Sequence, residues 1–219
     1  MMKKLLHCLI ALLLFSLAFA EDGSQKSGIR PDQDSFPSAA MPAVRASLAQ
    51  FLAQIPPHSM ADYGFANIEE IDQAWAAEPL KLYELDPQKV LDYIPGSSLG
   101  DLLRQSREWF VPVRAGAGIK AMLRLEEDQD GELQGVSFGY VPLAGQIQQA
   151  LAKPELRGYG QPALIISYQA KEFFLAFPEA NTEFLYALSS DEAQAKTDDL
   201  DGQIARIKAL ISLNLQQGY

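Results

Sequence analysis

The sequence predicts an α+β fold in which helices pack on one face of a mostly antiparallel sheet. Apolar residues at helical spacing dominate the chain before Glu108, and extended apolar segments dominate from there to Leu188. Short turns such as Asp130-Gly131 join consecutive strands, which favours antiparallel pairing. The chain also lacks the regular alternation of strands and helices that a parallel sheet requires.

The first half of the chain is predicted to be mainly helical. Pro56 and Pro57 end the first helix, because proline removes a backbone donor and fixes φ. Asn67 is placed to cap the second helix, with Glu70 at the capping-box position. The predicted elements are, in chain order, a helix over 42–55, a helix from Asn67, a strand over 80–85, a helix over 87–93 and a helix from Ser98.

The second half is predicted to supply most of the sheet. A helix over 142–151 interrupts the strands, and Asp198 or Asp199 can cap a final helix over 200–215. In general look this arrangement resembles cystatin-like, NTF2-like and profilin-like folds, a likeness that concerns architecture alone. The predicted strands cover 109–113, 119–125, 133–138, 163–168, 172–177 and 183–188.

The first twenty residues have the pattern of a secretory signal peptide. Lys3 and Lys4 precede an apolar run over 9–15, and the segment ends in the small-x-small sequence Ala-Phe-Ala. The run is shorter than the roughly 20 apolar residues of a membrane-spanning helix. We therefore expect a cleaved signal peptide over 1–20, a flexible lead-in over 21–39 and a single domain over 40–219.

Export would leave a strongly acidic chain without cysteine. The net charge is −10, and loss of the two positive charges of Lys3 and Lys4 changes it to −12. Cys8, the sole cysteine, leaves with the same segment, which excludes disulfides, thiol catalysis and zinc–thiolate sites. Because Cys8 precedes most of the apolar run, a lipid anchor is not expected. The acidic charge disfavours nucleic acid and anionic membranes as partners.

Two features carry weak signals for catalysis. Residues 96–100 match the G-x-S-x-G pattern of α/β-hydrolases, but that chemistry needs a histidine later in the chain. The one histidine outside the signal segment, His58, lies before this pattern. We therefore interpret Ser98 as a helix cap and His58 as a loop residue, and we expect neither to be catalytic.

An acidic cluster over 126–132 begins like a calcium loop. Asp128, Asp130 and Glu132 place carboxylates two residues apart around a turn glycine. The EF-hand pattern needs a glutamate at its twelfth position, which counted from Glu126 is Ser137 in a predicted strand. We interpret the cluster as a solvated hairpin tip, with calcium at its three carboxylates as the alternative. No cofactor and no other metal is expected.

Aromatic residues in and beside the predicted sheet are the better indication of a binding site. Adjacent residues in a strand point to opposite faces, so some rings lie away from the helix-covered face. They line a second core, an exposed patch or a groove. Arg114 and Arg124 flank this region and are placed either to bind an anionic group there or to pair with the acidic surface. The candidate binding residues are Trp109, Phe110, Arg114, Arg124, Phe138, Tyr140, Phe173 and Phe174.

These observations predict a non-catalytic binding, inhibitory or accessory module of the bacterial envelope. The short signal with two lysines fits the periplasm of a Gram-negative cell, with secretion as the alternative. The expected partner is a protein or a small ligand, and the last helix offers a surface for an oligomer. The alternative hypothesis is a hydrolase of cell-wall or other glycans, which needs two carboxyl groups at one cleft and a raised pKa in one of them.

Overall fold

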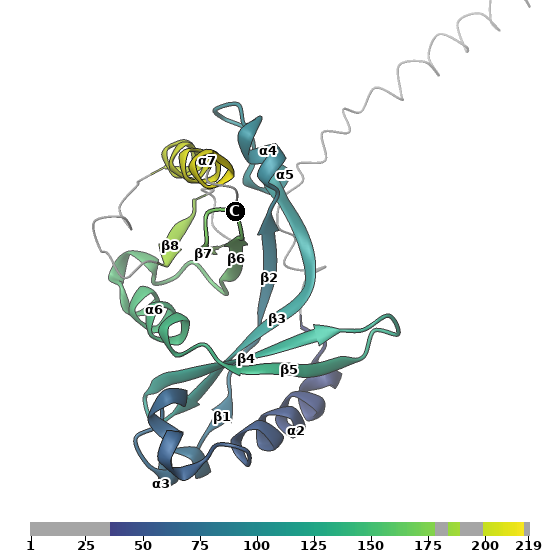
Figure 1. Cartoon of the computed structure of the whole chain (residues 1–219), viewed down its shortest axis with the longest axis vertical. Helices are drawn as coiled ribbons and strands as arrows, with labels where there is room; N and C mark the ends of the chain where they lie inside the picture. Colours follow the sequence, from purple (N-terminus) through teal and green to yellow (C-terminus); the bar gives the residue numbers. More distant parts are fainter. Residues whose placement is uncertain (1–35, 178–183, 189–198, 217–219) are drawn as a thin grey trace, which may run out of the picture.

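The computed structural model describes residues 36–177, 184–188 and 199–216 (Figure 1). The predicted signal peptide and residues 21–35 of the predicted lead-in lie outside these ranges. The elements are, in chain order, η1 (Ser38–Ala40), α2 (Met41–Leu52), η2 (Pro57–Tyr63), α3 (Ile68–Asp72), β1 (Trp75–Ala76), β2 (Leu80–Leu85), α4 (Pro87–Leu91), α5 (Leu99–Leu102), β3 (Leu103–Ala115), β4 (Gly118–Glu127), β5 (Leu133–Gly139), α6 (Val141–Ala152), η3 (Pro154–Leu156), β6 (Ala163–Ser167), β7 (Glu172–Ala176), β8 (Tyr186–Leu188) and α7 (Leu200–Gln216).

The strands form one eight-stranded sheet. Seven of them follow the order β5-β4-β3-β2-β6-β7-β8, and β1 pairs with β3. Every pair is antiparallel except β2 and β6, which run parallel with Leu82 opposite Leu164. The predicted α+β class with a mostly antiparallel sheet is therefore confirmed. Because β3, β4, β5 and α6 lie between β2 and β6 in the chain, the parallel pair joins the two halves of the molecule.

The predicted capping residues begin their helices as expected. The Asn67 side chain accepts a hydrogen bond from the backbone N–H of Glu70 at 2.9 Å. Ser98 caps α5 by accepting from the N–H of Gly100 at 3.2 Å, which confirms that it starts a helix. The Asp199 carboxylate accepts a backbone N–H in the first turn of α7 at 2.6 Å. Each bond satisfies a donor that the first helical turn leaves unpaired.

Helices cover both faces of the sheet, which corrects the expectation of a single covered face. Side chains alternate along β6 and β7, and both sets are apolar. Leu164 and Leu175 pack with α6, whereas Ile165 and Phe174 pack with α7 on the other side. Both faces of these strands are apolar and must be shielded from water, so a helix packs on each face. We call the side against α6 the α6 face.

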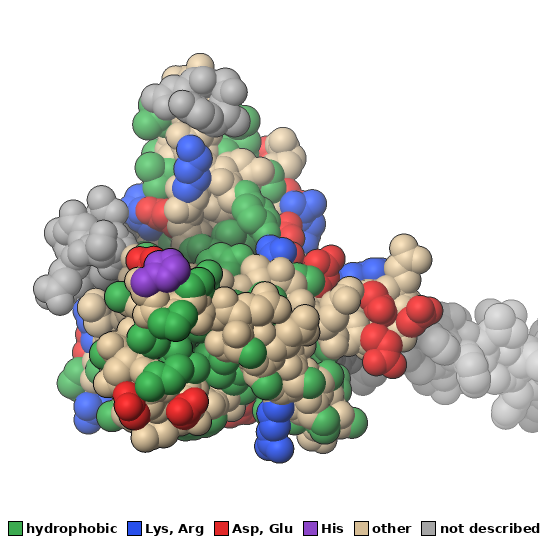
Figure 2. Space-filling view, turned by 60° about the horizontal axis from the view of Figure 1, so that its bottom comes forward, with side chains coloured by type: hydrophobic (Ala, Val, Ile, Leu, Met, Phe, Trp, Pro, Cys, Tyr) green, Lys and Arg blue, Asp and Glu red, His purple; other side chains and the backbone are tan. Residues whose placement is uncertain are grey.

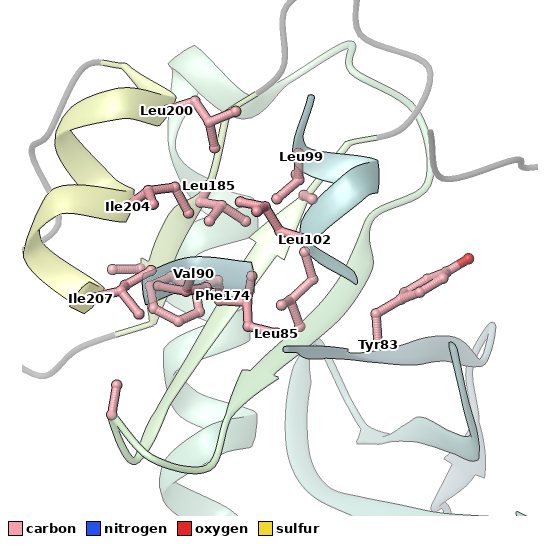
Figure 3. Packing of buried hydrophobic residues seen from close by; sticks show 14 of the residues in the cluster. Tyr83, Leu85, Val90, Leu99, Leu102, Phe174, Leu185, Leu200, Ile204 and Ile207 are labelled. Carbon is pink, nitrogen blue, oxygen red and sulfur yellow. The ribbon is translucent and has the colours of Figure 1, made fainter. Parts of the chain in front are cut away.

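A large buried cluster lies between α7 and the strands, on the face opposite α6. It combines side chains from α4, α5 and α7 with those of β2, β6 and β7. Figure 3 shows Ile207 pointing from α7 toward Val90 and Phe174, and Leu85 of β2 lies in the same cluster. This packing holds the last helix of the chain against the middle of the sheet.

A second cluster on that face lies under α2. Val44 and Leu48 of α2 pack against apolar residues of β3 and β4, among them Trp109. The ring of Phe36 meets Trp109 edge-on, with the ring centroids 5.0 Å apart. The predicted lead-in over 21–39 therefore ends in residues that dock on the sheet, because Phe36 already belongs to the packed structure.

Phe110 in β3 and Phe173 in β7 lean toward each other across the α6 face. Their ring centroids are 6.2 Å apart, although β2 and β6 separate their strands. In a flat sheet, three strand spacings would hold the two backbones about 14 Å apart. Figure 1 shows β4 and β5 extending at a steep angle away from β2 and β6, so the sheet is strongly twisted.

Candidate functional site

Charged and aromatic side chains occupy the part of the α6 face that continues past the apolar cluster under α6. That cluster includes Leu80, Met122 and Leu164, which α6 covers. Alternation along the strands places polar and aromatic residues next to them on the same side of the sheet. We call this group the Arg124 surface; its members are Glu84, Glu108, Phe110, Arg124, Tyr140, Tyr168 and Phe173.

Three aromatic members of the Arg124 surface, Phe110, Tyr140 and Phe173, form a connected, partly open wall. The Phe110 ring meets Tyr140 and Phe173 edge-on, with centroid distances of 5.3 and 6.2 Å. Tyr140 in this wall is 38% exposed and therefore faces solvent in part, and Tyr168, the fourth aromatic member of the surface, is 50% exposed. The wall therefore offers apolar area that the fold leaves uncovered.

The backbone at Tyr140 is strained. Its φ of 50° and ψ of 40° lie in the left-handed region, which a bulky side chain rarely adopts. The Tyr140 hydroxyl lies 3.0 Å from the Ser137 hydroxyl, and its ring packs on Phe110. Strain of this kind persists only where surrounding contacts fix the residue, and it is concentrated at functional sites.

Arg124 and Glu108 form an ion pair without a close hydrogen bond. Nη1 of Arg124 lies 3.6 Å from Oε2 of Glu108, and the two side chains are 31% and 21% exposed. This distance is longer than a good hydrogen bond. Nε of Arg124 is buried and has no hydrogen-bond partner among the described residues. A buried N–H without an acceptor is costly, so this guanidinium is incompletely satisfied, and an added acceptor at its other N–H groups would stabilise it.

The Glu108 carboxyl lies in surroundings that disfavour its charge. Burial, the largest cause, raises its pKa above the ordinary value, and Arg124 lowers the pKa in part. Glu126 faces Glu108 directly across β3 and β4 and raises the pKa further, as does Glu84. Like charges opposite each other destabilise a sheet. A carboxyl perturbed in this way marks a candidate site for binding or chemistry.

The Tyr168 hydroxyl adds a neutral hydrogen-bond donor to the surface. Burial raises the Tyr168 pKa above its ordinary value near 10, and the charges of Glu108 and Glu84 act in the same direction. The phenol therefore stays protonated at physiological pH and can donate one hydrogen bond. Arg124 and Tyr168 together supply donors, and Glu108 supplies an acceptor.

Three of the predicted binding residues lie in the cores on the opposite face. Trp109 and Phe174 are 5% and 0% exposed. Phe138 stacks on three rings of the cluster under α2. Their neighbours Phe110 and Phe173 point to the α6 face, as alternation along a strand requires. Of the eight predicted residues, the structure brings together Phe110, Arg124, Tyr140 and Phe173.

Arg114 lies at the far end of β3, away from the Arg124 surface. Its guanidinium carbon is 5.9 Å from the centroid of the Trp75 ring, and Nη2 donates to the Ala117 carbonyl at 3.1 Å. Trp75 is 52% exposed. Arg114 therefore supports the turn between β3 and β4 and an exposed tryptophan, and it does not flank the aromatic wall.

The acidic hairpin tip is organised by its own turn. Oδ1 of Asp128 accepts hydrogen bonds from the backbone N–H groups of Asp130 and Glu132, both at 2.9 Å. Figure 2 shows acidic side chains gathered toward the free end of the β4–β5 arm. Across residues 36–177, 184–188 and 199–216, no group of three or more His, Cys, Asp or Glu side chains is arranged to hold a metal ion. His58 lies exposed in η2.

Sequence reasoning missed Glu84, Glu108 and Tyr168 as members of the site. Glu108 could not be singled out, because many acidic residues are spread along the chain and nothing in the sequence distinguishes one from the others. The register of β3 against β4 and the parallel pairing of β2 with β6 decide which acids meet. Tyr168 lies at the end of a predicted strand, and its position over the face depends on the same long-range pairing.

Comparison with known proteins assigns no family to this chain. No protein-family model matches it, and no curated protein and no solved structure is significantly similar to it. The general likeness to cystatin-like, NTF2-like and profilin-like folds therefore stays a prediction. Among the helices in the described part of the chain, none is long and apolar enough to cross a membrane.

Proposed function

We propose that this protein is an exported, non-catalytic binding or accessory module of the bacterial envelope, with the Arg124 surface as its ligand site. One observation carries the proposal: a largely buried arginine, whose Nε has no hydrogen-bond partner in the described part of the chain, lies beside partly exposed aromatic rings on the α6 face. Ligand sites are commonly concave, mostly apolar and furnished with a few oriented polar groups. The predicted residues Phe110, Arg124, Tyr140 and Phe173 are the centre of this site.

The envelope location rests on the N-terminal sequence. The charged start, the apolar run and the small-x-small ending of residues 1–20 support export, with the periplasm favoured over secretion. Fractionation of the producing cell tests this directly. Protein in the periplasmic or extracellular fraction, beginning at Glu21, would support the proposal, and full-length protein in the cytoplasm would contradict it.

Native mass spectrometry of protein purified gently from its own organism tests the binding function. An added mass of a small molecule or partner protein is expected, and it should be lost in Tyr168→Ala, which removes an exposed ring of the surface. Trp75→Ala is the matched control, because Trp75 is equally exposed but lies elsewhere. A chain without added mass under native conditions would contradict the proposal.

A second candidate function is a carboxylate-dependent hydrolase of cell-wall or other glycans. The specific observation in its favour is the raised pKa of Glu108, with Glu126 opposite and Glu84 nearby. Such an enzyme needs one protonated and one ionised carboxyl at the reacting bond. Turnover of envelope glycans that is abolished by Glu108→Gln would favour the enzyme, and absence of turnover would favour the binding module.

An oligomer through α7 is a separate proposal. The helix buries Leu200, Ile204, Ile207 and Ile211 in the chain's own cluster, and Leu213 and Leu215 near its end are 50% and 54% exposed. A partner would therefore contact these two leucines. Sedimentation of the protein before and after Leu213→Glu tests it: a dimer that dissociates in the variant is expected, and a monomer in both would contradict the proposal.

A further inference from the structure

We infer that the Arg124 surface binds an amphipathic organic anion, and that Glu108 competes with this ligand for Arg124, so that binding tightens as the pH falls. This inference rests on the proposed binding function and names the chemistry of its ligand. It also gives the ion pair between Arg124 and Glu108 a role in controlling when the ligand is held.

The anionic group of the ligand is inferred from Arg124. A guanidinium has five N–H donors, and the nearest acidic partner of Arg124 lies at 3.6 Å, too far for a strong hydrogen bond. Nε is buried without a partner in the described part of the chain, so the ligand is expected to contact the Nη groups of this side chain, which is 31% exposed. A carboxylate, sulfonate or phosphate oxygen makes charge-assisted bonds to guanidinium at about 2.7–2.9 Å. Tyr168 belongs to the same surface and its hydroxyl stays protonated, so we expect it to donate to the same group.

The apolar part of the ligand is inferred from the aromatic wall. Phe110, Tyr140 and Phe173 are joined by edge-on ring contacts, and Phe110 stands directly opposite Arg124 across β3 and β4. Tyr140 is partly exposed, so the wall has uncovered area next to the guanidinium. A ligand with an apolar or aromatic body and one anionic end satisfies both parts, whereas a fully polar anion would leave the rings uncovered.

Glu108 is the competitor because it is the acid paired with Arg124. Several charged or titratable groups face Glu108. They are Arg124 and Glu126 from β4, Glu84 from β2, Tyr140, and Tyr168 after β6. Glu84 is itself paired with Arg104. A ligand anion on Arg124 adds another negative charge beside Glu108 and weakens its ion pair. The bound state therefore takes up a proton at Glu108 more readily than the free state. By linkage, affinity rises as the pH falls toward the pKa of Glu108.

Two related fluorescent dyes make the test specific for the anion. Anilinonaphthalene sulfonate carries a sulfonate that stays ionised from about pH 5 to about pH 8, and phenylnaphthylamine is the same aromatic body without it. Both are titrated into protein purified from cells that express the full chain. We expect the sulfonate dye to bind more tightly than the neutral dye, and its affinity alone to rise between about pH 7.5 and about pH 5.

Two substitutions separate the roles of the pair. Arg124→Gln should weaken binding of the sulfonate dye about 10-fold and leave the neutral dye nearly unchanged, because only the charge-assisted bonds are lost. Glu108→Gln should tighten the sulfonate dye at neutral pH and remove its pH dependence. Arg114→Gln, on the same strand as Glu108 but away from the surface, is the matched control and should change neither dye.

The outcomes distinguish the inference from the function on which it rests. Equal binding of both dyes, lost in Phe173→Ala but unaffected by Arg124→Gln, would overturn the anionic ligand and keep a binding surface. Failure of both dyes to bind the native protein would contradict the binding surface as well. Tighter binding of both dyes by Glu108→Gln would indicate loosened packing and would count against competition between Glu108 and the ligand. Circular dichroism and the melting temperature are therefore measured for each variant.

Discussion

The Tyr93 hydroxyl donates a hydrogen bond to Oδ1 of Asp201, although the two residues are 108 positions apart in the chain. The same oxygen accepts the backbone N–H of Gly96 at 3.0 Å. One carboxylate at the start of α7 thus holds the segment between α4 and α5. The Tyr93 hydrogen bond, then that of Gly96, lowers the pKa of Asp201 below its ordinary value.

Asp201→Asn should lower the melting temperature at neutral pH and should lower it less in acid. A carboxyl with a lowered folded-state pKa contributes stability above its ordinary pKa of 3.8, and this contribution is lost as the pH falls through the folded-state value. Thermal unfolding at about pH 6 and about pH 3 measures the difference. Asp101→Asn, an exposed acid in α5, is the control. An equal loss at both pH values would contradict the assignment.

Gly64→Ala should destabilise the protein far more than Gly96→Ala. Both glycines have positive φ, 85° and 87°, so alanine is strained by about 1 kcal/mol at either position. A Cβ at Gly64 would also overlap the Lys120 carbonyl oxygen, whereas the space at Gly96 is open. Backbone cannot yield as a flexible side chain can, so we expect a further loss of about 2 kcal/mol or more at Gly64. Urea unfolding of the two variants measures it, and equal losses would refute the packing argument.

Arg206→Gln should cost more stability than Arg104→Gln. Arg206 of α7 binds Glu172 of β7 through two hydrogen bonds of 2.8 and 2.7 Å, and both side chains are less than a quarter exposed. Arg104 is 55% exposed and lies 3.5 Å from Glu84. We expect the free energy of unfolding to fall by about 2 kcal/mol when the doubly bonded Arg206–Glu172 pair is broken, and by about 0.5 kcal/mol or less for the exposed Arg104–Glu84 pair. Similar free energies of unfolding would show that the close pair adds nothing to the docking of α7.

Phe174→Ala should mainly lower the stability of the protein, whereas Phe173→Ala should mainly weaken dye binding. Phe174 is fully buried between β7 and α7, and its truncation should cost about 3–5 kcal/mol of stability. Phe173 is partly buried on the α6 face, so its truncation should cost about 1–2 kcal/mol and weaken both dyes at the Arg124 surface. Chemical unfolding and dye titration on both variants measure these effects. A severe folding loss at Phe173 with unchanged dye binding would remove this residue from the site.

Most elements of this fold were predictable because their signals are local. The strand over 80–85 coincides with β2, and the helix over 142–151 differs from α6 by one residue at each end. β3 was predicted too short. Its first half, from Leu103 to Glu108, is largely polar and becomes a strand because β2 offers it a partner, with the Ser106 hydroxyl donating to the Leu82 carbonyl at 2.9 Å. β1 has two residues, too few for any periodic pattern.

Half of the candidate site was predictable for the same reason. Alternation along a strand predicts that Trp109 and Phe110 point to opposite faces of the sheet, but the sequence does not indicate which face α6 covers. Both faces of β6 and β7 are apolar, so hydrophobicity does not distinguish them. The meeting of Glu108 with Arg124 depends on strand register, and that of both with Tyr168 depends on the parallel pairing of β2 and β6.

That parallel pairing also sets the order in which the molecule can fold. β2 has no partner on one side until β6 has been synthesised, because Leu82 of β2 pairs with Leu164 of β6. Pairings so distant in the chain close large loops and slow folding. A chain that ends before β6 would expose the β2 edge and its apolar side chains to other chains. The β2 edge of the nascent protein therefore stays open to aggregation until β6 (Ala163–Ser167) has emerged.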